Sequence, residues 1–184
     1  SAPCTANGDD VELVVGTPGF KADLYDDDLP PTGVYLNNPQ AVALNADGDL
    51  YYSDTGNHRV RMLDADLNLV TTVIGHSGLG SDSNAALYQN IEEPHAIVFD
   101  SYGNLVASSS STIKLVEPNA NGVVTGAGRL HTIYPQNAVS DYNCLHALAF
   151  DSTSSPDDTI HVLDSCTGDW IQLKRMAASD LETP

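Results

Sequence analysis

The sequence predicts an all-β protein made of three four-stranded sheets, arranged as blades of a β-propeller. Three observations support this class: a composition that favours strands and turns, a repeat with a period near fifty residues, and a tight turn inside two of its three copies. Val, Ile, Thr and Tyr favour strands, and they are plentiful beside the turn formers Gly, Asn and Asp. Repeats of this length with strand-like content are typical of propeller blades rather than of solenoid turns.

The repeat has three copies, and each predicts a strand, a turn and a second strand. The copies cover residues 39–54, 94–108 and 145–164. Their starting points are 55 and then 51 residues apart. Gly48 and Gly103 stand where a tight hairpin turn needs a positive φ, whereas the third copy has a longer polar loop at 152–158.

Further strands follow each copy. A third strand is expected at 59–63, 112–116 and 170–174, and a fourth at 69–74 and 130–134. No fourth strand follows the third copy, but residues 12–15 have the pattern of an isolated strand before the first blade. We therefore expect the N-terminal segment to supply the outer strand of the third blade. The single partial propeller domain, 1–184, then divides into an N-terminal extension (1–10), a closing strand (11–15), blades at 39–75, 94–135 and 145–175, and a C-terminal tail (176–184).

The charge of the chain excludes several kinds of partner. Its 25 acidic and 7 basic residues give a formal net charge of −18 and a pI near 4.2. Such a surface repels phosphate backbones and anionic lipid, which argues against nucleic-acid binding and membrane docking. No apolar run approaches the ~20 residues of a membrane span. The 184 residues suffice for one sizeable core.

The three cysteines are Cys4, Cys144 and Cys166, and no C-x-x-C pair exists, which argues against a zinc ribbon or a thioredoxin-like site. Cys144 and Cys166 bracket two neighbouring predicted strands, so we expect a disulfide between them in an oxidising compartment. The alternative is three reduced, buried thiols. With the disulfide formed, Cys4 is left free or pairs with another chain. A disulfide and an acidic surface together predict a secreted or extracellular protein.

The first copy resembles an NHL repeat. Residues 39–64 carry the pattern of that family, including Pro39, the Gly48 turn and the Asn57-His58-Arg59 element. The resemblance extends over residues 11–175. The sequence departs from the family pattern in having Ala41, Ala96 and Ala147 where Gly is frequent, and Ser110-Ser111-Thr112 in place of Asn-x-Arg.

The resemblance implies an NHL-type propeller, and the family usually closes a ring of six blades, so this chain would hold half of a ring. Three blades cannot close a ring alone. The chain is then a piece of a longer polypeptide, or two copies each supply three blades, or another chain completes the propeller. A compact four-bladed ring is a further option, but the sequence offers too few strands for it.

Three polar residues occupy the same repeat position, at the start of the strand that lines a propeller channel: Gln40, His95 and His146. Imidazoles converging from separate strands are a normal way to bind zinc or copper. The superfamily also includes the peptide-amidating lyase, whose zinc histidines lie in Pro-His motifs. Pro94-His95 matches that motif, His146 matches it without the proline, and Gln40 does not match. We therefore predict His95 and His146 as metal ligands, with Gln40 as the third channel position.

The alternative for these residues is a structural one, in which they are channel-facing polar groups bonded to water or backbone. The lyase's other catalytic groups match nothing here, so no catalytic residue is assigned. The remaining histidines are expected to lie in loops or strands and not to be metal ligands: His58, His76, His131 and His161. The acidic run at 23–28 lacks the glycine of a calcium loop, so we expect a solvated inter-blade loop.

Two functions remain open. The first is an extracellular module that binds a protein or a glycan, or serves in a structural assembly. The second is a metal-dependent lyase or hydrolase built on the channel histidines. Nucleophile-elbow, Walker, dinucleotide and H-E-x-x-H motifs are all absent from the sequence. The sequence therefore favours the binding module over the enzyme.

Overall fold

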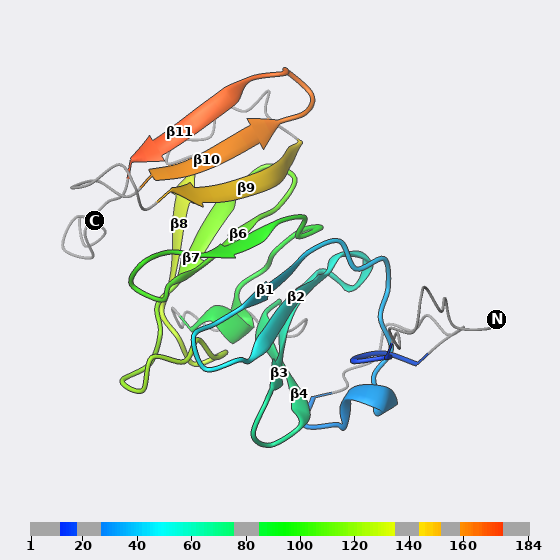
Figure 1. The fold of residues 1–184 in the computed structure, drawn as a ribbon. Helices are drawn as coiled ribbons and strands as arrows, with labels where there is room; N and C mark the ends of the chain where they lie inside the picture. The colour runs from blue at the N-terminus through cyan, green and yellow to red at the C-terminus, as the bar shows by residue number, and fades with distance from the viewer. Residues whose placement is uncertain (1–11, 18–26, 76–84, 135–143, 152–158, 175–184) are drawn as a thin grey trace, which may run out of the picture.

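The computed structural model describes residues 12–17, 27–75, 85–134, 144–151 and 159–174. These residues form strands β1 to β11 in three antiparallel sheets, with three short 3-10 turns between them. The sheets follow one another in sequence order, and the second lies between the first and the third (Figure 1). The predicted fold class, a three-bladed array of the propeller type, is confirmed.

The first blade has the strand order β1-β2-β3-β4. Its strands are β1 (Val42–Leu44), β2 (Leu50–Asp54), β3 (Arg59–Asp64) and β4 (Leu69–Ile74). The β1–β2 hairpin turns at Gly48, which has a φ of 94° as expected for this turn. Asn45 closes the turn, since its Oδ1 accepts the backbone N–H of Asp49 at 2.8 Å.

The second blade repeats this plan with the order β5-β6-β7-β8. Its strands are β5 (Ile97–Phe99), β6 (Leu105–Ser108), β7 (Ile113–Val116) and β8 (Leu130–Tyr134). Asp100 takes the place of Asn45, and its Oδ1 accepts the backbone N–H groups of Tyr102 and Asn104, both at 2.9 Å. The repeated Asx turn explains why both hairpins are tight.

The third blade has three strands in the described part of the chain, in the order β11-β10-β9. They are β9 (Leu145–Asp151), β10 (Thr159–Asp164) and β11 (Trp170–Lys174). Together with the other two sheets they give strand positions that agree closely with the sequence prediction. No fourth strand pairs with β11 among these residues.

The N-terminal segment differs from the expectation that 11–15 forms the closing strand. Residues 12–14 have no regular structure, and the chain bends at Val15 and Gly16, where Gly16 has a φ of 106°. The Gly16 N–H donates to the carbonyl of Pro31 at 2.9 Å. Val15 packs in a cluster with Val34 beside the first blade. The segment is therefore held by its own chain at the first blade (Figure 1), because the loop 31–34 takes up its hydrogen bonds.

Two apolar clusters hold the blades together. The interface of blades one and two contains the buried residues Tyr51, Val60, Met62, Val73, Ile74, Ala86, Ile91, Ile97, Leu105, Ala107, Val116 and Val124. The interface of blades two and three contains Val106, Ile113, Leu115, Leu145, Ile160 and Val162. The hydroxyl of Tyr51 donates a hydrogen bond to the carbonyl of Val124 at 2.8 Å. Its ring packs edge-on against Phe99, with the ring centroids 4.9 Å apart. Apolar burial between neighbouring sheets thus supplies the core.

The innermost strands β1, β5 and β9 contact one another in succession. Residues at the starts of these strands therefore lie close together although they belong to three different blades. Gln40, His95 and His146 stand at these positions. No helix in the described ranges is long and apolar enough to cross a bilayer.

Candidate functional site

The structure brings the three predicted channel residues together at the starts of the inner strands. The imidazole rings of His95 and His146 have centroids 4.1 Å apart and are tilted by 54°. The Oε1 atom of Gln40 lies 3.0 Å from Nδ1 of His95. The three side chains at equivalent repeat positions are therefore in contact, and metal binding by them stays a prediction.

Backbone hydrogen bonds fix the main chain of two of these residues in the same way. The N–H of Gln40 donates to Ser53 in the first blade, and the N–H of His95 donates to the carbonyl of Ser108 at 2.9 Å in the second. The preceding Pro94 carbonyl also accepts the hydroxyl of Thr55 from the first blade. His95 is therefore held from both sides of the blade interface.

The partners of the two rings define which nitrogen is available. The Gln40 Oε1 can only accept, so His95 Nδ1 carries the proton in the arrangement shown, and Nε2 keeps its lone pair. His146 Nδ1 lies 3.1 Å from the hydroxyl of Ser165. With both Nδ1 atoms engaged, Nε2 is the nitrogen that each ring offers to a metal ion or a proton. Metal-ligating histidines are commonly oriented by such partners.

Electrostatics favours the neutral form of His95. Partial burial lowers its pKa below the usual 6.5, and the neighbouring His146 ring lowers it further. Glu93 acts in the opposite direction and raises the pKa. The neutral imidazole is the form that coordinates metals.

The pair lacks a further strong ligand among the described residues. Catalytic zinc usually has three protein ligands, drawn from His, Cys and carboxylates. The histidines supply two, and the nearest additional groups are the amide of Gln40 and the hydroxyl of Ser165. The donor set therefore fits a zinc or copper ion only in part.

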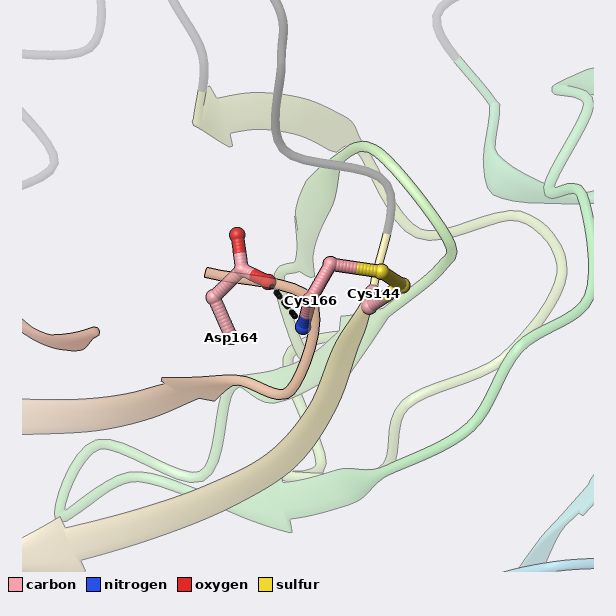
Figure 2. A group of neighbouring side chains, drawn as sticks. All are labelled: Cys144, Asp164 and Cys166. Atoms are coloured by element: carbon pink, nitrogen blue, oxygen red, sulfur yellow. Dashed lines mark hydrogen bonds between the residues drawn. A yellow bond between two sulfur atoms is a disulfide. The ribbon is translucent and has the colours of Figure 1, made fainter. Parts of the chain in front are cut away.

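The expected disulfide joins Cys144 and Cys166, whose Cα atoms are 5.4 Å apart (Figure 2). It links the start of β9 to the β10–β11 turn. The N–H of Ser165 in that turn donates to the carbonyl of Cys144 at 3.0 Å, while its hydroxyl reaches His146. The disulfide turn thus carries a partner of the histidine pair. Cys4 lies outside the described residues.

The other histidines occupy structural positions. His58 is exposed, as expected, and its Nδ1 accepts the N–H of Glu93 at 3.2 Å. His131 lies 3.0 Å from a carboxylate oxygen of Glu117, and His161 accepts the indole N–H of Trp170. His76 lies outside the described residues.

A buried charge cluster in the first blade was missed by the sequence analysis. Arg59, Arg61 and Asp54 are each at most 1 % exposed. Asp27 lies 3.5 Å from Arg61 and accepts the hydroxyl of Thr72 at 2.7 Å. The expectation of a solvated loop at 23–28 is therefore wrong for Asp27, because a buried guanidinium needs a counter-charge. The two arginines at alternate positions of one strand were the available signal.

The comparisons with known proteins begin with the family model. Residues 36–62 match the model of the NHL repeat. This match covers β1, β2 and most of β3 in the first blade. The chain is also 27 % identical over 112 residues to the chloroplastic protein SUPPRESSOR OF QUENCHING 1 of Arabidopsis thaliana, which covers 58 % of this chain and 11 % of that protein.

Solved structures are similar to the chain as well. An auxiliary nutrient binding protein from Bacteroides thetaiotaomicron is 22 % identical with a TM-score of 0.41, over 53 % of this chain and 26 % of that one. Virginiamycin B lyase from Staphylococcus aureus is 11 % identical with a TM-score of 0.44, over 80 % of this chain and 46 % of that one. The chain spans about a tenth of the curated relative and less than half of each of these structures.

Proposed function

We propose that this chain is an NHL-type propeller module, structural and protein-binding, whose two outermost blade faces stack on further blades supplied by a second copy of the chain. The observation that carries the proposal is the open apolar face of the third blade. Leu163 and Trp170 are 52 % and 65 % exposed there, beside Ala147 and Ala149. These residues line a shallow hollow of about 280 Å³.

Both faces of the third blade carry apolar side chains. On one face, Ile160 and Val162 are buried against the second blade. On the other, the strand register places Leu163 opposite both Ala147 and Trp170, while His161 and Gln172 follow further along the same face. Apolar side chains on both faces are typical of a sheet covered on both sides. The apolar end of the exposed face therefore supports contact with a further blade.

The first blade presents the complementary end of the array. Val42 and Leu44 on its inner strand are 68 % and 63 % exposed. The rest of this face is covered by a segment containing the turn η1 (Pro31–Gly33) and Val34. The equivalent turn η3 (Ala86–Tyr88) lies 55 residues later and fills the interface of blades one and two.

Each end of the array therefore offers half of a blade interface. Two copies related by a two-fold axis would place the third blade of each against the first blade of the other and close six blades into a ring. The net charge of −18 on each copy opposes this association. Salt screens such repulsion, so association should strengthen as ionic strength rises.

The single tryptophan of the chain, Trp170, lies on the proposed interface and reports its burial. Light scattering should give the mass of two chains, and Trp170 emission should shift to the blue as concentration rises. Leu163→Glu and Leu44→Glu should each return the mass to one chain. Leu67→Glu is the matched control, because Leu67 is 68 % exposed in the β3–β4 turn, away from both faces. A one-chain mass with solvent-exposed Trp170 at every concentration contradicts the proposal.

The proposal places the module outside the cell, and the Cys144–Cys166 disulfide supports this, because disulfides persist in oxidising compartments. A protein partner is favoured over a glycan because the surface of the hollow is mainly apolar and offers few hydrogen-bonding groups. Soluble oligosaccharides should therefore leave Trp170 emission unchanged. Recovery of the chain from the cytosol with free Cys144 and Cys166 thiols would contradict the extracellular location.

A metal-dependent lyase or hydrolase is the second candidate, favoured by the 4.1 Å approach of two rings whose Nδ1 atoms are both engaged. His95 and His146 would hold zinc or copper through Nε2, with Gln40 beside them, and the ion would supply Lewis-acid chemistry. Metal analysis of the purified protein tests this. Stoichiometric metal that is lost in His95→Ala but kept in the control His58→Ala supports the candidate. A metal-free, folded protein after incubation with zinc and with copper contradicts it.

A further inference from the structure

We propose that Cys144, Asp164 and Cys166 form a redox-gated site for a zinc-class metal ion, which binds when the disulfide is reduced and is excluded when it is formed. One ligand atom from each residue lies within 4.8 Å of the others. This is the one group of three or more His, Cys, Asp or Glu residues with such spacing in the described ranges. The site shares no ligand with the histidine pair, although Ser165 of the same turn contacts His146, and it does not depend on the proposed function.

The two cysteines are accessible to solvent, whereas Asp164 is buried. Cys166 is exposed and Cys144 is half-buried, so a reductant and a metal ion can reach the sulfur atoms from solvent. Asp164 is fully buried next to them at the end of β10 (Figure 2). A carboxylate held in this way adds a fixed negative charge to the two thiolates that reduction can produce.

Backbone hydrogen bonds hold the site in shape without the disulfide. The N–H of Ser165 donates to the carbonyl of Cys144, and the N–H of Asp164 donates to the carbonyl of Asp169, each at 3.0 Å. The Asp164 Oδ1 accepts the N–H groups of Cys166 and Thr167 at 2.8 and 3.2 Å. Reduction of the disulfide therefore leaves both sulfur atoms close to Asp164. A preformed ligand set is what tight metal binding requires.

The second oxygen of Asp164 strengthens the inference. Its Oδ2 is buried and has no hydrogen-bond partner among the described residues. In the first blade, the corresponding Oδ2 of Asp54 accepts the side-chain N–H of Asn57 at 2.9 Å. A buried carboxylate oxygen without a partner is costly, and a cation bound beside it would remove that cost.

The gating follows from the chemistry of sulfur. Two equivalents of a thiol reductant, R–SH, convert the disulfide into two Cys thiols and R–S–S–R, so the protein gains two electrons and two protons. Binding of a divalent ion then releases both protons and forms two metal–thiolate bonds. Exchange with a disulfide R–S–S–R reverses the reaction: the two thiolates lose two electrons and join, two R–S⁻ groups leave and take protons from water, and the ion is released because neutral disulfide sulfurs are weak ligands.

The donor set selects the class of ion. Two thiolates and one carboxylate suit zinc or its probe cadmium, whereas calcium and magnesium prefer oxygen ligands. A tetrahedral ion would take its fourth ligand from water. The two cysteines lie 22 residues apart, which a search for C-x-x-C spacing does not find.

The test uses the full chain carrying Cys4→Ser, which removes the third thiol. Cadmium is added to samples with the disulfide intact and to samples reduced by a phosphine that is then removed under argon. We expect one cadmium per reduced chain, with cadmium–thiolate absorption in the ultraviolet, and none per oxidised chain. Cadmium-bound chain should also resist reoxidation by a mild disulfide oxidant.

Two variants make the result specific. Asp164→Asn keeps the acceptor oxygen for the turn and should weaken cadmium binding by on the order of tenfold or more, with circular dichroism confirming the fold. His95→Ala should leave the cadmium–thiolate absorption unchanged. Equal cadmium binding by oxidised and reduced chains, an unchanged affinity in folded Asp164→Asn, or a reduced chain without thiolate absorption would each overturn the proposal.

Discussion

The first and third blades close the same turn, between their second and third strands, by different means. In the first blade, Asp54 accepts the backbone N–H of Asn37 at 2.8 Å and the side chain of Asn57, and lies 3.8 Å from Arg61. In the third blade, the carboxylate of the corresponding Asp164 bonds only to the N–H groups of its own turn in the described structure, and a disulfide fastens that turn to β9.

The difference follows from what covers each blade. The segment before the first blade brings Asn37 and Asp27 onto its outer face, so charged groups there are buried and need each other. Among the residues that the structure describes, no segment covers the outer face of the third blade, and Asp164 has no arginine partner there. A repeated aspartate therefore serves a long-range charge network in one blade and a local turn in the other.

The largest effect should come from breaking the charge network. Asp54→Ala removes the acceptor for Asn37 and Asn57 and a counter-charge of the fully buried Arg61. Asp27 remains 3.5 Å from Arg61, but the two donors left without an acceptor cost about 1–3 kcal/mol each, so we expect a total loss of about 3–5 kcal/mol. Urea unfolding should show this loss. A cost below ~1 kcal/mol would mean that the network contributes little to the blade.

The disulfide should come next in size. Cys144→Ser with Cys166→Ser opens a covalent loop with a sequence separation of 22 residues, which should lower the free energy of unfolding by about 3 kcal/mol. The measurement is urea unfolding of the double variant beside the parent under non-reducing conditions. Adding a reductant should destabilise the parent and leave the double variant unchanged. Equal stability of the two proteins would show that the turn is held by its hydrogen bonds alone.

Much of this architecture could be predicted from the sequence because it repeats. Strands at 69–74, 130–134 and 170–174 match the structure at both ends, since hydrophobic patterning and turn glycines act locally. The alignment of Gln40, His95 and His146 also came from the repeat, because equal positions in successive blades lie at one axis.

Other features could not be predicted because they depend on contacts that are distant in sequence. The pairing of Asp27 with Arg61 spans 34 residues, and no local pattern specifies it. The closing strand expected at 11–15 is not formed by residues 12–15 within this chain for a related reason: the apolar pattern fits a strand, but the loop 31–34 binds the segment. The approach of Asp164 to the disulfide likewise became visible only in three dimensions.

A smaller effect should come from the turn of the third blade. Asp164→Ala removes two hydrogen bonds to backbone N–H groups within the turn and should cost about 1–2 kcal/mol. Measured by urea unfolding beside Asp54→Ala, it tests the comparison directly. Should Asp164→Ala cost as much as Asp54→Ala, the two aspartates would have equal roles and the contrast between the blades would be lost.

The smallest effect concerns the pH dependence of stability near the inner strands. Burial and the His146 ring lower the pKa of His95, so the folded chain binds fewer protons there than the unfolded chain. His95 therefore contributes a loss of stability that grows as the pH falls below about 6.5, the usual pKa of histidine. Thermal unfolding between about pH 7.5 and 5.5 should show a shallower decline for His95→Gln than for the parent.

Glu93 opposes the lowering of the His95 pKa, so a variant of Glu93 gives a second and more specific test. Glu93 raises the pKa of His95, so Glu93→Gln should lower it further and steepen the decline in stability on acidification. Leu67→Gln, in the exposed β3–β4 turn, should keep the slope of the parent. Opposite changes of slope in His95→Gln and Glu93→Gln would locate the effect at this ring. Parallel changes would assign it to the many other carboxylates of an acidic chain, in which case the inner strands would not differ from the rest of the surface.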